Sequence, residues 1–124
     1  MLELHPDRLL PAGQDERAVA RRIFAEIEEL PVVSPHGHLD AAMFRDNRHV
    51  SDPAGLLVTK DHYVVRLLHG LGVPLPELGL GRADAPGRPI WHHLCRHWRS
   101  LAGTPSRLWL EYQLHDLFGL VEAP

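Results

Sequence analysis

The clearest pattern in the chain is an apolar stripe at helical spacing over residues 14–30. Ala20 is followed at i+3, i+4, i+7 and i+10 by Ile23, Phe24, Ile27 and Leu30. This spacing places all of these side chains on one face of an amphipathic helix. Because the residue before a proline disfavours helical backbone, the proline at position 31 predicts the end of this helix.

Further apolar stripes follow residues that favour helix starts. Asp61, whose side chain can accept a backbone N–H as an N-cap, precedes a stripe formed by Val64, Leu67, Leu68 and Leu71. Shorter helical turns are expected at residues 39–44 and after Pro53. Residues 73–87, rich in proline and glycine, are expected to form a surface loop.

Towards the C-terminus the same spacing predicts a helix over residues 89–102. Its apolar face would carry Trp91, Leu94, Cys95, Trp98 and Leu101. Thr104 followed by Pro105 has the pattern of an N-cap and a first helical residue. The helix that they begin would bury Leu110, Leu114 and Leu117. Together these patterns predict about five helices.

Residues 32–38 form the one segment with the character of a β-strand. They begin with Val32 and Val33, and β-branched residues are enriched in strands. A single strand has no partner in the chain for its backbone donors and acceptors, because strands are stable only in sheets. The sequence therefore predicts a mainly α fold with one short β-strand. Either this strand pairs with something outside residues 1–124, or the segment is not a strand in this chain.

Length and composition narrow the class of protein. The 124 residues correspond to one domain, and the net charge of −3 argues against a nucleic-acid binder with a broad basic surface. The single cysteine, Cys95, excludes an internal disulfide and fits a reducing compartment. No stretch approaches membrane-spanning length or has the pattern of a secretory signal. We expect a cytoplasmic protein with no nucleic acid and no membrane as a partner.

Two histidines, His36 and His38, lie at the end of the predicted strand. In an extended backbone alternate side chains share a face, so His36 and His38 would point to the same side. Two imidazoles on one face can hold a divalent metal ion. The alternative is a histidine-rich loop after a helix, because the chain has 10 histidines and some close pairs arise by chance.

Other residues with possible chemistry have simpler interpretations. His93 and His97 are i, i+4 neighbours that could chelate a metal, but no acidic residue is near them in sequence, which favours a solvated helix face. Trp91 and Trp98 are expected in the core, and Cys95 as a small buried hydrophobe. Asp40, which follows the His-x-His motif, could orient a ligand imidazole or cap the next helical turn, and capping is favoured.

Several segments match one family in the same order. A helix followed by Pro-x-x-x-x-His-x-His-Leu, ending at Leu39, resembles the opening of the uronate isomerases (glucuronate isomerases), a branch of the amidohydrolase superfamily. Residues 60–66 (Lys-Asp-His-Tyr-Val-Val-Arg) resemble the Asp-His-Tyr-x-x-Arg helix of that family. Residues 109–114 (Trp-Leu-Glu-Tyr-Gln-Leu) and the later Phe118-Gly119 resemble its Trp-x-x-x-x-Leu…Phe-Gly segment.

The resemblance implies a fold that the chain cannot complete. The family fold is a TIM-like (β/α)₈ barrel with a helical insertion, and such a barrel needs at least about 200 residues. Residues 1–124 would be a single incomplete domain, the N-terminal portion of that barrel. It would contain the N-terminal helix, the first barrel strand at 32–38 and a helical insertion at 39–119.

The resemblance also implies an activity in uronic acid catabolism. The family interconverts aldose and ketose uronates, D-glucuronate with D-fructuronate and D-galacturonate with D-tagaturonate, by moving a proton between C2 and C1. This chemistry needs a base, an acid and stabilisation of the enediolate. By resemblance His36 and His38 are metal ligands for a divalent ion, with zinc favoured.

The same resemblance makes His62 and Tyr63 catalytic and substrate-binding residues. Arg66 would either hold Asp61 or bind the substrate. Without the resemblance, His62 and Tyr63 would be two half-exposed rings at the start of an amphipathic helix. A histidine can act as an acid or base near neutral pH, and a tyrosine hydroxyl can exchange a proton with a sugar oxygen.

Two alternative functions remain open. The chain could belong to another metal-dependent amidohydrolase, or be a non-catalytic helical remnant that acts through protein–protein association. In either enzyme interpretation we expect the isolated chain to be inactive, because its metal and substrate shells are incomplete. We also expect self-association or a completing polypeptide, because helices without a barrel to cover would expose apolar surface.

Overall fold

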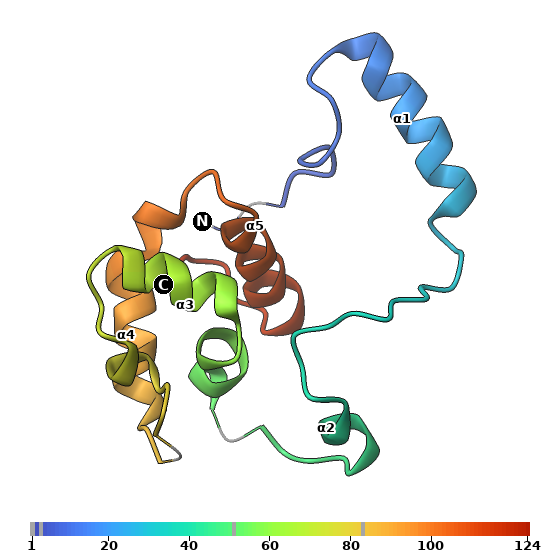
Figure 1. The fold of residues 1–124 in the computed structure, drawn as a ribbon. Helices are drawn as coiled ribbons and strands as arrows, with labels where there is room; N and C mark the ends of the chain where they lie inside the picture. Colours follow the sequence, from blue (N-terminus) through green and yellow to red (C-terminus); the bar gives the residue numbers. More distant parts are fainter. Residues whose placement is uncertain (1, 3, 51, 83) are drawn as a thin grey trace.

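The computed structural model describes residues 2, 4–50, 52–82 and 84–124 (Figure 1). All regular structure in these ranges is helical, which confirms the mainly α prediction. The elements are α1 (Gln14–Ile27), α2 (Ala41–Arg45), η1 (Gly55–Thr59), α3 (His62–Gly70), η2 (Leu75–Leu78), α4 (Gly87–His97), η3 (Trp98–Leu101), α5 (Pro105–Tyr112) and η4 (Gln113–Leu117). The elements η1 and η4 are π-helical turns, and η2 and η3 are 3₁₀ turns.

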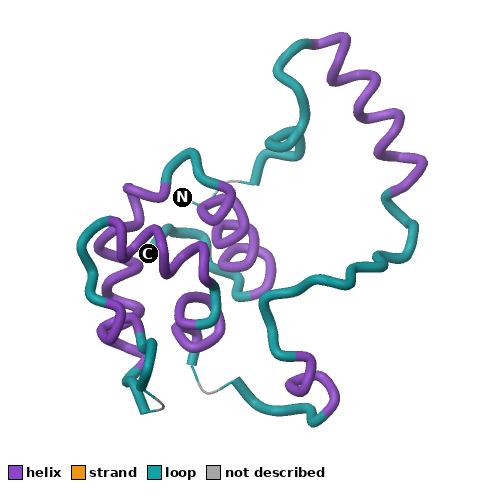
Figure 2. Tube along the Cα trace, in the orientation of Figure 1, coloured by secondary structure: helices purple, strands orange, loops and turns teal. Residues whose placement is uncertain are grey.

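The predicted strand at 32–38 is wrong. The described ranges contain no strand, and residues 31–40 form an extended linker (Figure 2). Val32 and Val33 are 90% and 91% exposed, so neither packs against another element. The valines have the composition of a strand, but a ladder needs a neighbouring strand to hydrogen-bond with, and the described residues supply none.

Helix α1 confirms the predicted periodicity but not a buried face. It projects away from the other helices (Figure 1), and none of its residues is buried. The apolar stripe is open to solvent, with Ile23 60% and Phe24 54% exposed. The helix ends at Ile27, before the predicted end at residue 30, and three hydrogen bonds from Arg21 to Asp7 tie it to the preceding turn.

The helices other than α1 and α2 pack around one hydrophobic core. Figure 1 shows α3, α4 and α5 gathered into a bundle, with α1 and α2 outside it. Leu2 joins this bundle, and its backbone N–H donates to the carbonyl of Val121. The largest fully buried side chains are Leu68, Leu78, Leu94, Leu101, Leu114, Val58 and Val64. A core of this kind stabilises the bundle mainly by removing apolar surface from water.

Three predicted helix caps are confirmed. Asp40 accepts from the Ala42 N–H at 2.9 Å at the start of α2. Asp61 accepts from the first turn of α3, and Thr104 from the Arg107 N–H at 3.2 Å at the start of α5. Each cap gives a partner to a backbone donor that the helix itself leaves free.

Two further predictions need correction. Residues 73–87 are not only a surface loop, because Val73 and Leu78 belong to the core and η2 lies within the segment. Gly79 closes η2 at a φ of +85°, where a Cβ would lie 3.0 Å from Ile90. The helix predicted over 89–102 is divided into α4 and η3, with Trp98 buried at the junction.

Within the described part of the chain, no helix has both the length and the apolar character that a membrane span requires.

Candidate functional site

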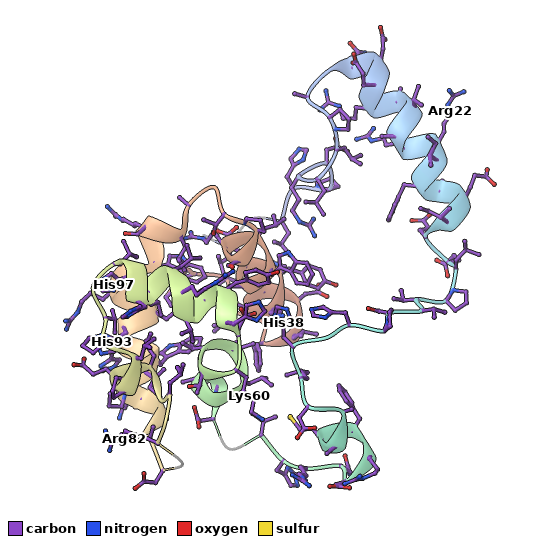
Figure 3. All side chains as sticks on the ribbon, in the orientation of Figure 1. Arg22, His38, Lys60, Arg82, His93 and His97 are labelled. Atoms are coloured by element: carbon purple, nitrogen blue, oxygen red, sulfur yellow. The ribbon has the colours of Figure 1, made fainter. Side chains whose placement is uncertain are left out.

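The His-x-His motif lies on the extended linker where it passes the bundle. Figure 3 shows His38 beside the bundle, and its side chain is partly buried, whereas His36 is exposed. The two ring centres are 5.2 Å apart and the ring planes are nearly perpendicular. The two histidines therefore lie close together, although the segment is not a strand.

The start of α3 brings two further rings to the same place. The ring centre of His38 lies 4.9 Å from that of His62 and 5.3 Å from that of Tyr63. His62 and Tyr63 are themselves 4.2 Å apart. All four rings singled out from the sequence as metal-ligating or catalytic therefore form one cluster, which we call the His-Tyr cluster (His36, His38, His62 and Tyr63).

Asp61 joins the linker to α3. Its Oδ1 accepts the backbone N–H groups of Tyr63 and Val64 at 2.9 and 3.1 Å, and its Oδ2 lies 3.0 Å from His38 Nδ1. Sequence reasoning found the cap but missed the contact with His38. The two residues are 23 positions apart, and no local pattern reports a contact over that distance.

Arg66 does not take the role of holding Asp61. Its guanidinium carbon lies 5.2 Å from the centre of the Tyr63 ring, one turn earlier on α3. An arginine over an aromatic face is attracted by the ring quadrupole and restricts the ring's orientation. Arg66 therefore packs on a member of the His-Tyr cluster and leaves a positive charge at its edge.

The spacing of the two motif histidines is compatible with a pair of ligands to one metal ion. Imidazoles that bind one tetrahedral zinc through nitrogens about 2.1 Å away have ring centres roughly 5 Å apart. The 5.2 Å between His36 and His38 agrees with that spacing. Among the described residues, no group of three or more His, Cys, Asp or Glu side chains is arranged to hold a metal, so this pair is not a complete ligand set.

The histidines of α4 do not form a second site in the described structure. His93 Nε2 lies 3.0 Å from Glu77 Oε2, and His97 Nδ1 lies 3.0 Å from the His93 carbonyl oxygen. The absence of a nearby acidic residue in the sequence was misleading, because η2 brings Glu77 to α4. Cys95 is partly buried on the same helix, and burial raises the pKa of its thiol, which disfavours the reactive thiolate.

Comparison with known proteins gives the family. A sequence model of glucuronate isomerase matches residues 14–123. The chain belongs to the glucuronate isomerase family. It is 50% identical over 119 residues to a uronate isomerase of Rhizorhabdus wittichii, and 46% identical over 125 residues to one of Xanthomonas euvesicatoria pv. vesicatoria. These alignments cover 96% and 97% of this chain.

A solved structure agrees with this family assignment. The crystal structure of glucuronate isomerase from Caulobacter crescentus matches 96% of this chain with a TM-score of 0.85 and 36% sequence identity. The match covers 26% of that structure, and the two curated relatives are covered over 25% and 26% of their length. The chain thus spans about a quarter of the glucuronate isomerases that it matches, and the resemblance seen in the sequence is confirmed.

Proposed function

We propose that this chain is the N-terminal part of a uronate isomerase that interconverts aldose and ketose uronates. The observation that carries the proposal is the His-Tyr cluster, in which a linker histidine meets His62 and Tyr63 at ring distances of 4.9 and 5.3 Å. Membership of the glucuronate isomerase family supports it. The substrates would be D-glucuronate and D-galacturonate, with D-fructuronate and D-tagaturonate as the products.

His36 and His38 would hold a divalent metal, with zinc favoured by the imidazole ligands. The bound ion would polarise substrate oxygens and lower the energy of the negative charge that develops during isomerisation. Their ring spacing of 5.2 Å is compatible with this role. The remaining ligands would come from a part of the complete enzyme that this chain does not contain.

His62 and Tyr63 would move protons and orient the sugar. Both side chains are exposed, so a substrate can reach them, and they lie beside the proposed metal ligand His38. A neutral imidazole can take a proton and an imidazolium can return it, while the phenol can donate a hydrogen bond to a sugar oxygen. The positive charge of Arg66, next to Tyr63, would favour the carboxylate of a uronate.

A completing polypeptide of about three times this length would supply the barrel, because the chain covers 25% of the Rhizorhabdus wittichii relative. The exposed stripe of α1 and the exposed Val32 and Val33 offer apolar surface for that contact. The isolated chain would be inactive because its ligand set is incomplete.

A chimera tests the proposal. The chain would replace the corresponding N-terminal quarter of the Rhizorhabdus wittichii uronate isomerase, to which it is 50% identical. We expect the chimera to convert D-glucuronate. His36→Ala and His62→Ala should each reduce kcat/KM by about 100-fold or more, as expected for loss of a metal ligand or an acid–base group.

The matched control is His92→Ala, which removes an exposed histidine of α4 outside the cluster and should leave the activity unchanged. A chimera that folds like its parent but does not convert either uronate would contradict the proposal. Equal activity in His36→Ala and the unmodified chimera would contradict the role of the metal ligand.

The second candidate is a non-catalytic helical protein that acts through association. It is favoured by the self-contained core of the bundle, to which α1 and the linker contribute no buried residue. An inactive but well-folded chimera would support this candidate over the first.

A further inference from the structure

Asp61 does more than cap α3, because its side chain also contacts His38 on the linker. Of the two carboxylate oxygens, Oδ1 accepts the N–H groups of Tyr63 and Val64, while Oδ2 lies 3.0 Å from His38 Nδ1. The side chains of Asp61 and His38 are both 28% exposed, so the contact is partly shielded from water. Capping needs only one oxygen, and the second is committed to the linker histidine.

The contact between Asp61 Oδ2 and His38 Nδ1 determines which nitrogen of the His38 ring carries the proton. A carboxylate offers only acceptor oxygens, so the hydrogen bond requires a proton on His38 Nδ1. A neutral imidazole carries one N–H, and its other nitrogen then has a free lone pair. For His38 this nitrogen is Nε2.

We propose that Asp61 is a positioning residue that holds His38 as the Nδ1–H tautomer and thereby leaves Nε2 as the ligating nitrogen. The same carboxylate fixes the first turn of α3, so it sets His38 and the His62–Tyr63 pair in one arrangement. This inference rests on the proposed function, because it assigns the atom through which His38 would bind the metal. Carboxylates that orient metal-binding imidazoles in this way act without touching the ion.

The tautomer can be measured without any metal. In the metal-free 124-residue chain with ¹⁵N-labelled histidine, long-range ¹H–¹⁵N correlation at alkaline pH distinguishes the protonated from the unprotonated ring nitrogen. The His38 signals are assigned by their loss in His38→Ala. We expect the unprotonated nitrogen of His38 to be Nε2.

The variant Asp61→Asn distinguishes the effect of Asp61 on the tautomer of His38 from its effect as the cap of α3. Asparagine caps helices about as well as aspartate, so α3 should keep its start. If the amide oxygen of the asparagine accepts the N–H groups at the start of α3, its amide nitrogen faces His38 and donates a hydrogen bond to Nδ1. The proton of His38 should then move to Nε2. An unchanged His38 tautomer in Asp61→Asn, or the Nε2–H form in the unmodified chain, would overturn the proposal.

Asp40→Asn is the matched control. Asp40 caps α2 in the same way, accepting from Ala42 at 2.9 Å, and lies two residues from His38 in the chain. The tautomer of His38 should not change in this variant. A change as large as that in Asp61→Asn would contradict a specific role for Asp61.

Zinc affinity provides an independent test of the role of Asp61. In the chimera described above, Asp61→Asn should weaken zinc binding by about 10- to 100-fold, the range seen when a partner of a ligating histidine is lost. Helical content and melting temperature should stay close to those of the unmodified chimera. If the unmodified chimera binds no zinc, the metal assignment of the proposed function fails, while the tautomer measurement still decides the role of Asp61.

Discussion

The guanidinium carbon of Arg107 lies 4.0 Å from the centre of the Trp98 indole ring. The same side chain donates from Nη1 to the Trp98 carbonyl at 2.6 Å and from Nε to Glu111 Oε1 at 2.6 Å. Arg107 thus joins η3 to α5 across the turn at residues 102–104. Because its side chain is 19% exposed, these contacts are only partly screened by water.

Loss of this arginine should destabilise the bundle. Arg107→Lys keeps a positive charge but cannot make both hydrogen bonds and stack on the indole with one planar group. We expect the free energy of unfolding in urea to fall by about 1–2 kcal/mol. The control Arg99→Lys changes an exposed arginine of η3 and should shift it by less than about 0.5 kcal/mol. Equal shifts in the two variants would show that the hydrogen bonds and the stacking of Arg107 together contribute nothing specific to stability.

The core should respond to truncation far more than the α1 stripe does. Leu68 in the last turn of α3 is fully buried, whereas Ile23 on α1 is 60% exposed. Leu68→Ala should lower the free energy of unfolding by about 2–5 kcal/mol, because it removes apolar contacts and leaves a cavity. Ile23→Ala should change it by less than about 0.5 kcal/mol. Urea denaturation followed by circular dichroism measures both.

A large loss of stability in Ile23→Ala would contradict this assignment of the core. It would mean that α1 packs against other residues of the chain in solution.

Local signals in the sequence predicted the helices and their starts. The caps at Asp40, Asp61 and Thr104 were found because a cap and its helix are only a few residues apart. Val64 and Leu68 of the α3 stripe are buried, as the helical period predicts, whereas Leu71 at the end of the stripe is 45% exposed. These features depend on neighbours in the chain, so the sequence contains what is needed to predict them.

The wrong strand and the missed contacts concern residues that are distant in the chain. Val32 and Val33 have a strand's composition, but a strand exists only with a partner, which the pattern cannot supply. Leu78 lies in a segment rich in proline and glycine, yet η2 places it in the core. The contact of Asp61 with His38 likewise depends on how the linker passes α3.

The sequence predicted which residues belong to the candidate site but not how they are arranged in space. His36, His38, His62 and Tyr63 were named from a motif and a family resemblance. Their meeting in one cluster, with Arg66 stacked on Tyr63 and not bound to Asp61, required the structure.

The exposed stripe of α1 should drive self-association of the isolated chain. Ile23, Phe24 and Ile27 present apolar surface to solvent, and burial of such surface favours association. Sedimentation velocity should show species larger than a monomer whose proportion rises with concentration. The double variant Ile23→Glu with Phe24→Glu should shift the chain towards monomer.

The control for this experiment is Arg22→Glu. Arg22 is an exposed residue of the same helix, and Figure 3 shows its side chain on the outer part of α1. This variant also adds negative charge but leaves the apolar stripe intact, so it should associate like the unmodified chain. A monodisperse monomer at all concentrations would contradict the prediction.

The contact between Arg21 and Asp7 should be sensitive to acid. Hydrogen bonds from Arg21 hold the pKa of Asp7 below its ordinary value of 3.8. Because the folded pKa is lowered, the contact stabilises the packing of α1 on the preceding turn above the unfolded pKa, and this stabilisation is lost as the pH falls through the folded pKa. In carboxyl-carbon NMR titrations, Arg21→Gln should raise the Asp7 midpoint, whereas Arg22→Gln should leave it unchanged. An Asp7 midpoint that is the same with and without Arg21 would show that the hydrogen bonds do not persist in solution.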